Sequence, residues 1–481
     1  MREGITVKKT AVNPYLPSWE YVPDGEPHVF DGRVYVYGSH DTFGDWVFCS
    51  GDYVCWSAPV DDLSDWRYEG VIYKKDQDPL SPDGRCCLYA PDAAKGPDGR
   101  YYLYYVYDSI DVVSVAVCDT PAGEYQFYGH VHYKDGTLLG ERAGDEPQFD
   151  PGVLVEGDKV YLYTGFGAFR DKGRHGAMAT VLEADMLTVA EEPKFIVPTE
   201  IYSEGTEYEG HAFFEASSIR KCGDTYYFVY SSHKFCELCY ATSKNPTENF
   251  RYGGVIIANN DVGIDTYKPA EKPMYYGGNN HGGMVEINGE WYIFYHRHTN
   301  GTSYSRQTCA EKIRIEADGS IKQVELTSCG LNRGPLPGKG YYPAYIACNL
   351  FTGKCDTPYT GGGGLWLDNR HPIITQNPAD GEKGEAFILN MTTGAQAGFK
   401  YFDFKDTKRV TVKVRGLNGK LTGKVKLRLG WDKEVIGEVP VGYCAVWTEF
   451  SADIAIPDGI HPLYFEYEGP CRIGFGGFTL E

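Results

Sequence analysis

Hydrophobic and polar positions alternate along this chain over short stretches that are separated by tight turns. Stretches such as 34–37 (VYVY) and 101–104 (YYLY) are built from β-branched and aromatic residues, a composition that is typical of strands, and they show no helical period. The turns that follow the first strand of each unit read DGR, GDK, GDT and NGE, which is the chemistry of tight hairpins. The pattern predicts an all-β protein.

One unit of this pattern occurs five times. Each unit has a polar or charged leading residue, a short strand, a tight turn and an aromatic-rich strand. The leading residues are 68, 58, 65 and 66 positions apart and are Asp24, Asp92, Asp150, Glu215 and His281. A tyrosine follows 11 positions after the leading residue in four units and 10 positions after it in the other. A period of about 60 residues leaves room for four strands, which make one propeller blade. The sequence therefore predicts a five-bladed β-propeller.

The alternative architecture is a pair of packed β-sandwiches. It would not explain why the leading residues occupy the same position in every unit. In a propeller the innermost strand of each blade starts near the central axis, so the five leading side chains are expected to converge there. Like charges repel and burial raises the pKa of a carboxyl group, so such a cluster is costly as mere structure. Any one member, Asp92 above all, can instead simply cap a turn. We otherwise expect Asp92 to contact substrate.

Carboxylates whose pKa values are pushed apart are what glycoside hydrolysis requires. The segments NPYLPSWEYVPDGEP, FDPGVLV and FFEASSI resemble the three catalytic motifs of glycoside hydrolase family 43, and the resemblance runs over about residues 10–330. It implies a five-bladed propeller enzyme that inverts the anomeric centre. It also implies that Asp24 is the general base, that Asp150 orients the acid and tunes its pKa, and that Glu215 is the general acid. The sequence departs from the commoner EGP form at Glu215-Ala216-Ser217.

The resemblance extends to further residues of the site. His281 resembles an axial histidine that supports a bound calcium ion or water in the channel; hydrogen bonding to the carboxylates is the alternative, and calcium prefers oxygen ligands. Arg306 resembles the arginine that approaches the sugar hydroxyls and the acid pair, and the alternative is a surface cation. Phe43, Trp46 and Tyr89 are candidates for a sugar-stacking platform, although aromatic residues of a propeller also fill its core.

The composition changes after residue 330. We expect a propeller over residues 1–330, a Pro/Gly-rich linker over 331–340 and a β-sandwich over 341–481, with a flexible loop at the glycines 361–364. Strand-like stretches recur from about residue 380, and they resemble a family 6 carbohydrate-binding module. That resemblance implies a sugar-binding domain, and the alternative is a stabilising domain that has lost its binding site.

Charge and cysteine content limit the class of partner and the compartment. The net charge of −20 argues against nucleic acid as a partner, and no apolar run approaches the roughly 20 residues that span a bilayer. The N-terminal MREGITVKKT shows no secretion signal, so we expect a cytoplasmic protein, with a processed secreted form as the alternative. Among the 14 cysteines, Cys86 and Cys87 are adjacent and Cys236-x-x-Cys239 has no second pair, which predicts reduced thiols.

The resemblance to family 43 implies an inverting exo-glycoside hydrolase that releases α-L-arabinofuranose or β-D-xylose from plant cell-wall oligosaccharides derived from arabinoxylan or arabinan. It would require no cofactor; calcium, if bound, would lie in the propeller channel at His281 or in the sandwich domain. Two alternatives are a non-catalytic carbohydrate-binding propeller and a family 43 enzyme that acts on another sugar, such as an endo-arabinanase or a galactosidase.

Overall fold

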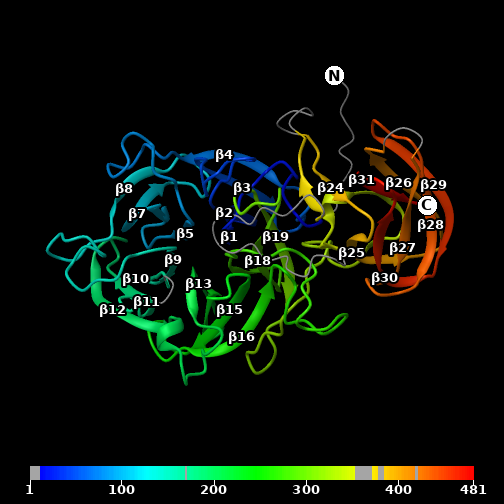
Figure 1. The fold of residues 1–481 in the computed structure, drawn as a ribbon. Coiled ribbons are helices and arrows are strands. Elements are labelled where there is room, and N and C mark those ends of the chain that lie inside the picture. The colour runs from blue at the N-terminus through cyan, green and yellow to red at the C-terminus, as the bar shows by residue number, and fades with distance from the viewer. Residues whose placement is uncertain (1–10, 168–170, 353–370, 378–383, 418–420) are drawn as a thin grey trace.

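The computed structural model describes residues 11–167, 171–352, 371–377, 384–417 and 421–481. Its larger part is a ring of five antiparallel sheets around a central axis (Figure 1). The sheets correspond one by one to the five repeat units of the sequence. In the described residues the first four sheets have four strands each and the fifth has three.

The strands of the ring follow one another along the chain, and each blade is a simple meander. They are β1 (Glu26–Phe30), β2 (Arg33–Tyr37), β3 (Tyr53–Pro59) and β4 (Arg67–Tyr73); β5 (Asp92–Lys95), β6 (Tyr101–Tyr107), β7 (Ile110–Cys118) and β8 (Gln126–His130); β9 (Gly152–Glu156), β10 (Lys159–Thr164), β11 (Gly176–Leu182) and β12 (Val189–Pro198); β13 (Phe213–Cys222), β14 (Thr225–Ser232), β15 (Glu237–Ser243) and β16 (Arg251–Ala258); and β17 (Met284–Ile287), β18 (Glu290–His298) and β19 (Arg306–Ile313).

The innermost strands close the ring. β1, β5, β9, β13 and β17 lie next to one another in that order, and a bridge between Gly25 and Gly282 joins the first blade to the last. The side chain of Asn13 donates to the Ala310 carbonyl at 3.0 Å and accepts from the Ala310 N–H at 2.9 Å. The start of the described chain is thereby tied to β19 of the last blade. Each leading residue of the repeat lies within three residues of the start of an innermost strand, as the sequence predicts.

Aromatic side chains fill the spaces between blades. One apolar cluster joins the first two blades and holds Tyr37, Tyr53 and Tyr105, each fully buried. Their hydroxyl groups find partners, since Tyr105 donates to Asp78 at 2.7 Å. A buried tyrosine needs such a partner because an unpaired hydroxyl group loses its hydration without compensation.

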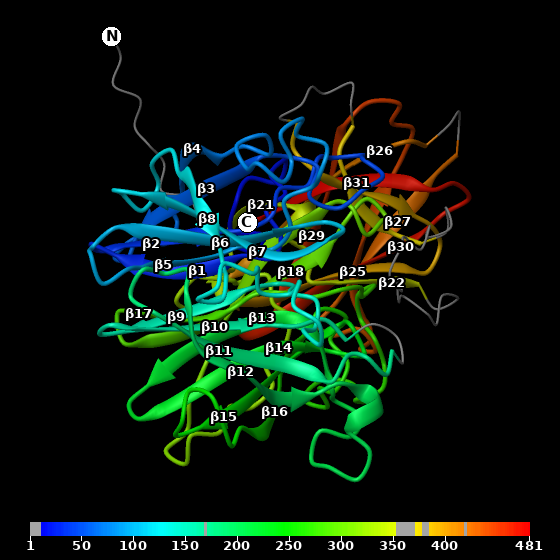
Figure 2. The ribbon, with the colours of Figure 1, turned by 90° about the vertical axis from the view of Figure 1, so that its left-hand side faces the viewer.

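The remaining strands form two six-stranded sheets beside the fifth blade (Figures 1 and 2). One sheet contains β20 (Leu336–Pro337), β22 (Asn349–Thr352), β25 (Ala395–Phe404), β27 (Gly423–Arg428), β28 (Val435–Val441) and β30 (Gly459–Glu468), and the other contains β21 (Gly340–Pro343), β23 (Ile373–Thr375), β24 (Phe387–Met391), β26 (Thr407–Arg415), β29 (Thr448–Ile456) and β31 (Ile473–Leu480).

One apolar cluster runs from these two sheets into the fourth and fifth blades, where it includes Tyr227 and Tyr295. The segment expected to be a linker is part of this architecture rather than a free connection. β20 lies within it and pairs with β25, and β21, which begins at Gly340, pairs with β31. The expected loop at 361–364 lies outside the described residues.

Helical structure in the described residues consists of two short 3-10 turns, η1 (Glu200–Tyr202) and η2 (Ala344–Ile346). None of the described helices has the length and hydropathy needed to cross a membrane. The thirteen cysteines in the described residues are free thiols, as their spacing predicts.

Candidate active site

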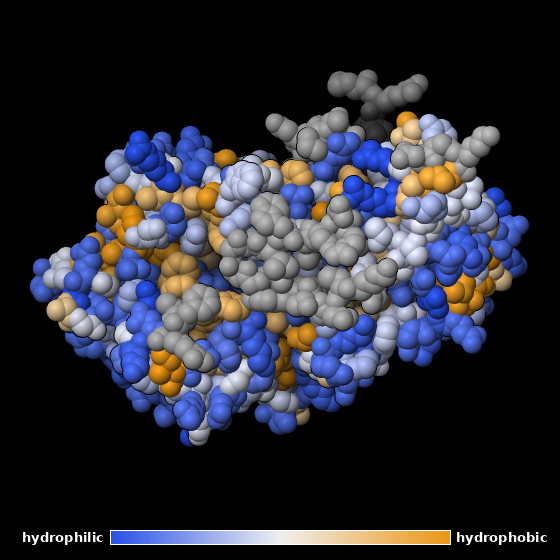
Figure 3. Space-filling model, viewed as in Figure 1, coloured by the Kyte–Doolittle hydropathy of each residue, from blue (hydrophilic) through white to orange (hydrophobic). Residues whose placement is uncertain are grey.

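A cavity of about 260 Å³ opens where the inner strands of the blades begin. It is lined by Asp24, Phe48, Cys49, Tyr89, Ala90, Phe149, Asp150, Phe166, Phe214, Glu215, Phe235, Asn279, His281 and Arg306. Six residues named from the sequence are thus brought together: the three carboxylates, the histidine, the arginine and Tyr89. On this face of the molecule the outer rim of the propeller is mostly hydrophilic, and hydrophobic residues form patches inside that rim (Figure 3).

Three residues at the carboxylates have left-handed backbone conformations. The φ angles are +57° at Asp24, +43° at Asp150 and +69° at Ala216. Such angles are disfavoured for residues other than glycine, and they cluster at functional sites, where the surrounding structure enforces them. Ala216 replaces the glycine of the commoner motif, and its conformation directs its N–H to Asp150 Oδ2 at 3.0 Å. This irregularity of β13 therefore links the second carboxylate to the residue that follows the third.

Arg306 holds Asp24 in place. Its Nη1 donates to both carboxylate oxygens of Asp24, at 3.0 and 3.2 Å. Its Nε and Nη2 donate to the two oxygens of Asp41, each at 2.9 Å. Arg306 is 2% exposed, so it is no surface cation. Burial raises the pKa of Asp24, but its neighbours, chiefly the Arg306 guanidinium, hold that pKa below its usual value.

His296 contacts Asp24 in its neutral form. Burial lowers the pKa of His296, although hydrogen bonding to Asp24 opposes this. Its Nε2 lies 2.6 Å from the Asn279 carbonyl, which can only accept, so Nε2 carries the proton. Its Nδ1 then accepts the backbone N–H of Asp24 at 3.3 Å. The histidine thereby fixes the backbone from which the Asp24 carboxylate projects.

The other two carboxylates have raised pKa values. Burial, followed by the neighbouring Asp150, raises the pKa of Glu215 to about 8. Burial also raises the pKa of Asp150, although hydrogen bonding to His281 opposes it. His281 Nδ1 lies 3.4 Å from Asp150 Oδ2. Burial lowers the pKa of His281, but Asp150 outweighs it and brings this pKa to about 9. At neutral pH the cavity therefore contains an ionised Asp24 and a protonated Glu215.

A second carboxylate of the first blade lies behind the cavity. Glu26 is fully buried, and its Oε2 accepts from Ser218 at 3.0 Å and from Arg220 at 2.8 Å. Burial raises its pKa to about 7, although Arg220 opposes the shift. Gly283 makes room for it, because a Cβ atom there would lie 2.2 Å from Glu26 Oε2. Sequence reasoning missed Glu26, which stands outside the repeat register, two residues after Asp24.

Three predicted substrate contacts do not line the cavity. Asp92 is fully buried and accepts from His28 Nε2 at 2.6 Å and from the Val153 N–H at 2.8 Å, so it joins two neighbouring blades. Phe43 stacks on Tyr21 with ring centroids 5.8 Å apart, and Trp46 is 72% exposed. The loop after β2 does supply an aromatic residue to the cavity, but the residue is Phe48, whose ring lies 4.8 Å from the Arg306 guanidinium.

An arc of aromatic rings forms the wall of the cavity. Tyr89, Phe149, Phe166, Phe214 and Phe235 contact one another in that order, with centroid separations of 5.8, 4.8, 5.1 and 4.6 Å. Aromatic faces suit the apolar faces of a sugar ring. Sequence reasoning named only Tyr89 of this arc. Two further members could be found from their position in the sequence, because Phe149 and Phe214 directly precede the leading residues Asp150 and Glu215.

Comparison with known proteins identifies the family to which this chain is similar. Residues 22–321 match the glycosyl hydrolases family 43. A xylosidase/arabinosidase of Thermoclostridium stercorarium is 65% identical over 474 residues, which cover 98% of this chain and 99% of the relative. A family 43 β-xylosidase/α-arabinofuranosidase from a compost microbial metagenome, solved with xylotriose in a calcium-free form, is 28% identical with a TM-score of 0.51 and covers 64% of this chain and 96% of its own.

Similarity to solved structures also extends over the whole chain. An arabinoxylan arabinofuranohydrolase of Bacillus subtilis, solved with cellotetraose, covers 97% of both chains with a TM-score of 0.52 and 21% identity, a likeness of fold alone. The family match spans the residues that carry all three carboxylates of the cavity. This chain belongs to glycosyl hydrolases family 43 and is a glycoside hydrolase.

Proposed function

We propose that this enzyme is an inverting exo-hydrolase that releases α-L-arabinofuranose or β-D-xylose from plant cell-wall oligosaccharides. One observation carries the proposal: a single aromatic-walled cavity holds one carboxylate with a lowered pKa, Asp24, and one with a raised pKa, Glu215. Hydrolysis with inversion needs an ionised base for water and a protonated acid for the leaving oxygen.

Each carboxylate has a distinct role in this mechanism. Glu215 donates its proton to the glycosidic oxygen as the bond to the anomeric carbon breaks. Asp24, oriented by Arg306, accepts a proton from the water that attacks the opposite face of the sugar. Asp150 keeps the pKa of Glu215 high and is itself fixed by Ala216 and His281. The products are the shortened oligosaccharide and a pentose of inverted configuration.

The substrate assignment rests on the relatives and on the size of the cavity. Proteins named xylosidase/arabinosidase are similar over the whole chain or over its family 43 part. A volume of about 260 Å³ lies just below the roughly 300–1,000 Å³ of sites for larger ligands, which suits one terminal sugar ring. That size supports exo action on a chain end.

The stereochemistry of the first product tests this mechanism. With p-nitrophenyl β-D-xylopyranoside as substrate, proton NMR should show α-xylose before mutarotation equilibrates the anomers. The parallel screen compares p-nitrophenyl arabinofuranoside with the xyloside and identifies the sugars released from arabinoxylan and arabinan. Initial release of β-xylose would require a retaining mechanism and overturn the roles given to Asp24 and Glu215.

The pH profile of kcat/KM should have its basic limb near pH 8. Glu215 acts in its protonated form, so activity is retained below its pKa of about 8 and lost as the pH rises through that value. Asp24 acts in its ionised form, and its lowered pKa keeps it ionised throughout the neutral range. Initial rates on xylobiose across the pH range measure the limb, and a profile that falls already near the ordinary carboxyl pKa would contradict the assignment.

We further propose that the C-terminal part is a β-sandwich similar to a carbohydrate-binding module and that the protein is cytoplasmic. Two six-stranded sheets with a common apolar cluster support the first point. The apolar cluster shared with the fourth and fifth blades favours a stabilising role for this part. The free thiols of the described cysteines agree with a reducing compartment.

A further inference from the structure

The guanidinium of Arg220 places a positive charge behind the cavity. Arg220 extends from β13 toward β1, where its Nη2 donates to Glu26 Oε2 at 2.8 Å and to the Pro27 carbonyl at 3.0 Å. The same Nη2 lies 3.3 Å from His28 Nε2. Its Nη1 donates to the Ile219 carbonyl at 2.7 Å. The guanidinium is thus held by acceptors from two blades, and its side chain is only 12% exposed.

The groups around Arg220 are those that would otherwise bind a metal ion. Glu26, His28 and Asp92 each offer a ligand atom, and these atoms lie within 4.8 Å of one another. Arg220 Nη2 stands among them. His28 Nε2 lies 2.6 Å from Asp92 Oδ1. A carboxylate oxygen can only accept, so Nε2 carries a proton that it donates to Asp92, and it has no lone pair for a metal.

Calcium does not fit the remaining donors. Glu26 Oε1 and His281 Nε2 face each other at 3.8 Å, and both are buried without a hydrogen-bond partner among the described residues. Calcium takes about six to eight oxygen ligands, and this pair supplies a single oxygen. A cation at Glu26 would also stand beside the guanidinium and be repelled by it.

We propose that Arg220 takes the place of a channel metal ion in this enzyme. The guanidinium neutralises Glu26 and Asp92, keeps Glu26 beside His281 and so preserves the contact between His281 and Asp150. Arg220 is a positioning residue, since it touches none of the cavity-lining carboxylates. Wild-type activity and stability are then independent of added calcium, and removing the guanidinium should create a cation requirement.

Replacing Arg220 by alanine tests this proposal. The channel would keep Glu26, His28 and Asp92 but lose the cation, so kcat/KM should fall by about tenfold or more. Calcium chloride or millimolar guanidinium chloride should restore part of the loss. Calcium should also raise the unfolding temperature of Arg220→Ala by at least about 2 °C and leave that of the wild type unchanged. This thermal measurement detects cation binding whether or not the variant is active.

Controls separate the proposal from general damage and from failure of the catalytic assignment. Arg251→Ala removes an arginine of the same blade that is 77% exposed and pairs with Glu207 at 3.4 Å, and it should respond to neither cation. Arg220→Lys retains a cation and should stay closer to wild type than Arg220→Ala. The proposal is overturned if chelation inactivates the wild type, if calcium shifts its unfolding temperature, or if Arg220→Ala shows no cation-dependent shift.

Discussion

Replacing Glu215 by glutamine should lower kcat/KM on xylobiose by about 10²–10⁴-fold, the usual contribution of a general acid. The amide keeps the volume of the side chain and the aromatic arc around it but has no proton to give. The loss of kcat/KM should be smaller for a substrate whose leaving group needs no protonation, so the variant should be less impaired on p-nitrophenyl β-D-xylopyranoside. Its basic limb near pH 8 should also disappear, because no group with that pKa remains in the acid role.

Glu204→Gln provides a matched control for this variant. Glu204 is exposed on the segment that leads into β13, so the same change there should leave kcat/KM within about twofold of wild type. Circular dichroism and the unfolding temperature check that both variants fold. Equal losses of Glu215→Gln on the disaccharide and on the aryl xyloside would show that Glu215 does not protonate the leaving group.

The periodicity of the sequence predicts those residues of the site that occupy equivalent positions of the repeat. Asp24, Asp150, Glu215 and His281 occupy equivalent positions of a unit, and in a propeller such positions converge near the axis. The same register also contains Asp92, yet its carboxylate is taken up by His28 and a backbone N–H. Register therefore predicts where a side chain starts, whereas the neighbours it meets decide what the side chain does.

Contacts between distant loops were beyond the reach of the sequence pattern. Asp41 and Arg306 are 265 positions apart, and no repeat relates them. Phe48 lies in the same loop as Phe43 and Trp46, the two residues that the sequence suggests. Composition identifies an aromatic loop but not which ring turns into the cavity. The C-terminal sheets show the same limit: their strand composition was readable, but the pairing of β20 with β25 inside the expected linker was not.

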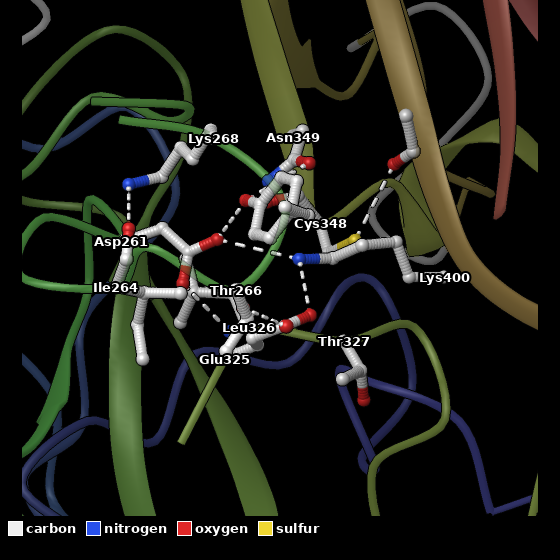
Figure 4. Close-up of polar contacts among 12 residues, drawn as sticks. Asp261, Ile264, Thr266, Lys268, Glu325, Leu326, Thr327, Cys348, Asn349 and Lys400 are labelled. Carbon is white, nitrogen blue, oxygen red and sulfur yellow. Dashed lines mark hydrogen bonds and ion pairs between the residues drawn. The ribbon is translucent and has the colours of Figure 1, made fainter. Parts of the chain in front are cut away.

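A network of ion pairs joins the propeller to the C-terminal sheets, and disrupting it should have a large effect on stability. Lys400 on β25 has a fully buried side chain, and its Nζ lies 3.3 Å from Asp261 Oδ2 and 3.1 Å from Glu325 Oε2 (Figure 4). Asp261 follows β16 of the fourth blade and also accepts the Leu326 N–H at 3.0 Å. Burial lowers the pKa of Lys400, but Asp261 and Glu325 more than offset this and raise it above its usual value. The lysine therefore stays charged between the two carboxylates.

Lys400→Met should reduce the free energy of unfolding by about 3–5 kcal/mol, because it leaves the buried Asp261 and the partly buried Glu325 without their cation. Urea denaturation monitored by tryptophan fluorescence measures the change. Lys408→Met removes a lysine that is 71% exposed and pairs with Asp406 at 2.5 Å, and it should cost less than about 1 kcal/mol. Adding Asp261→Asn and Glu325→Gln to Lys400→Met should recover part of the stability, because the uncompensated charge is then gone. If Lys400→Met matched the Lys408→Met control, the buried charges would not hold the C-terminal sheets against the propeller.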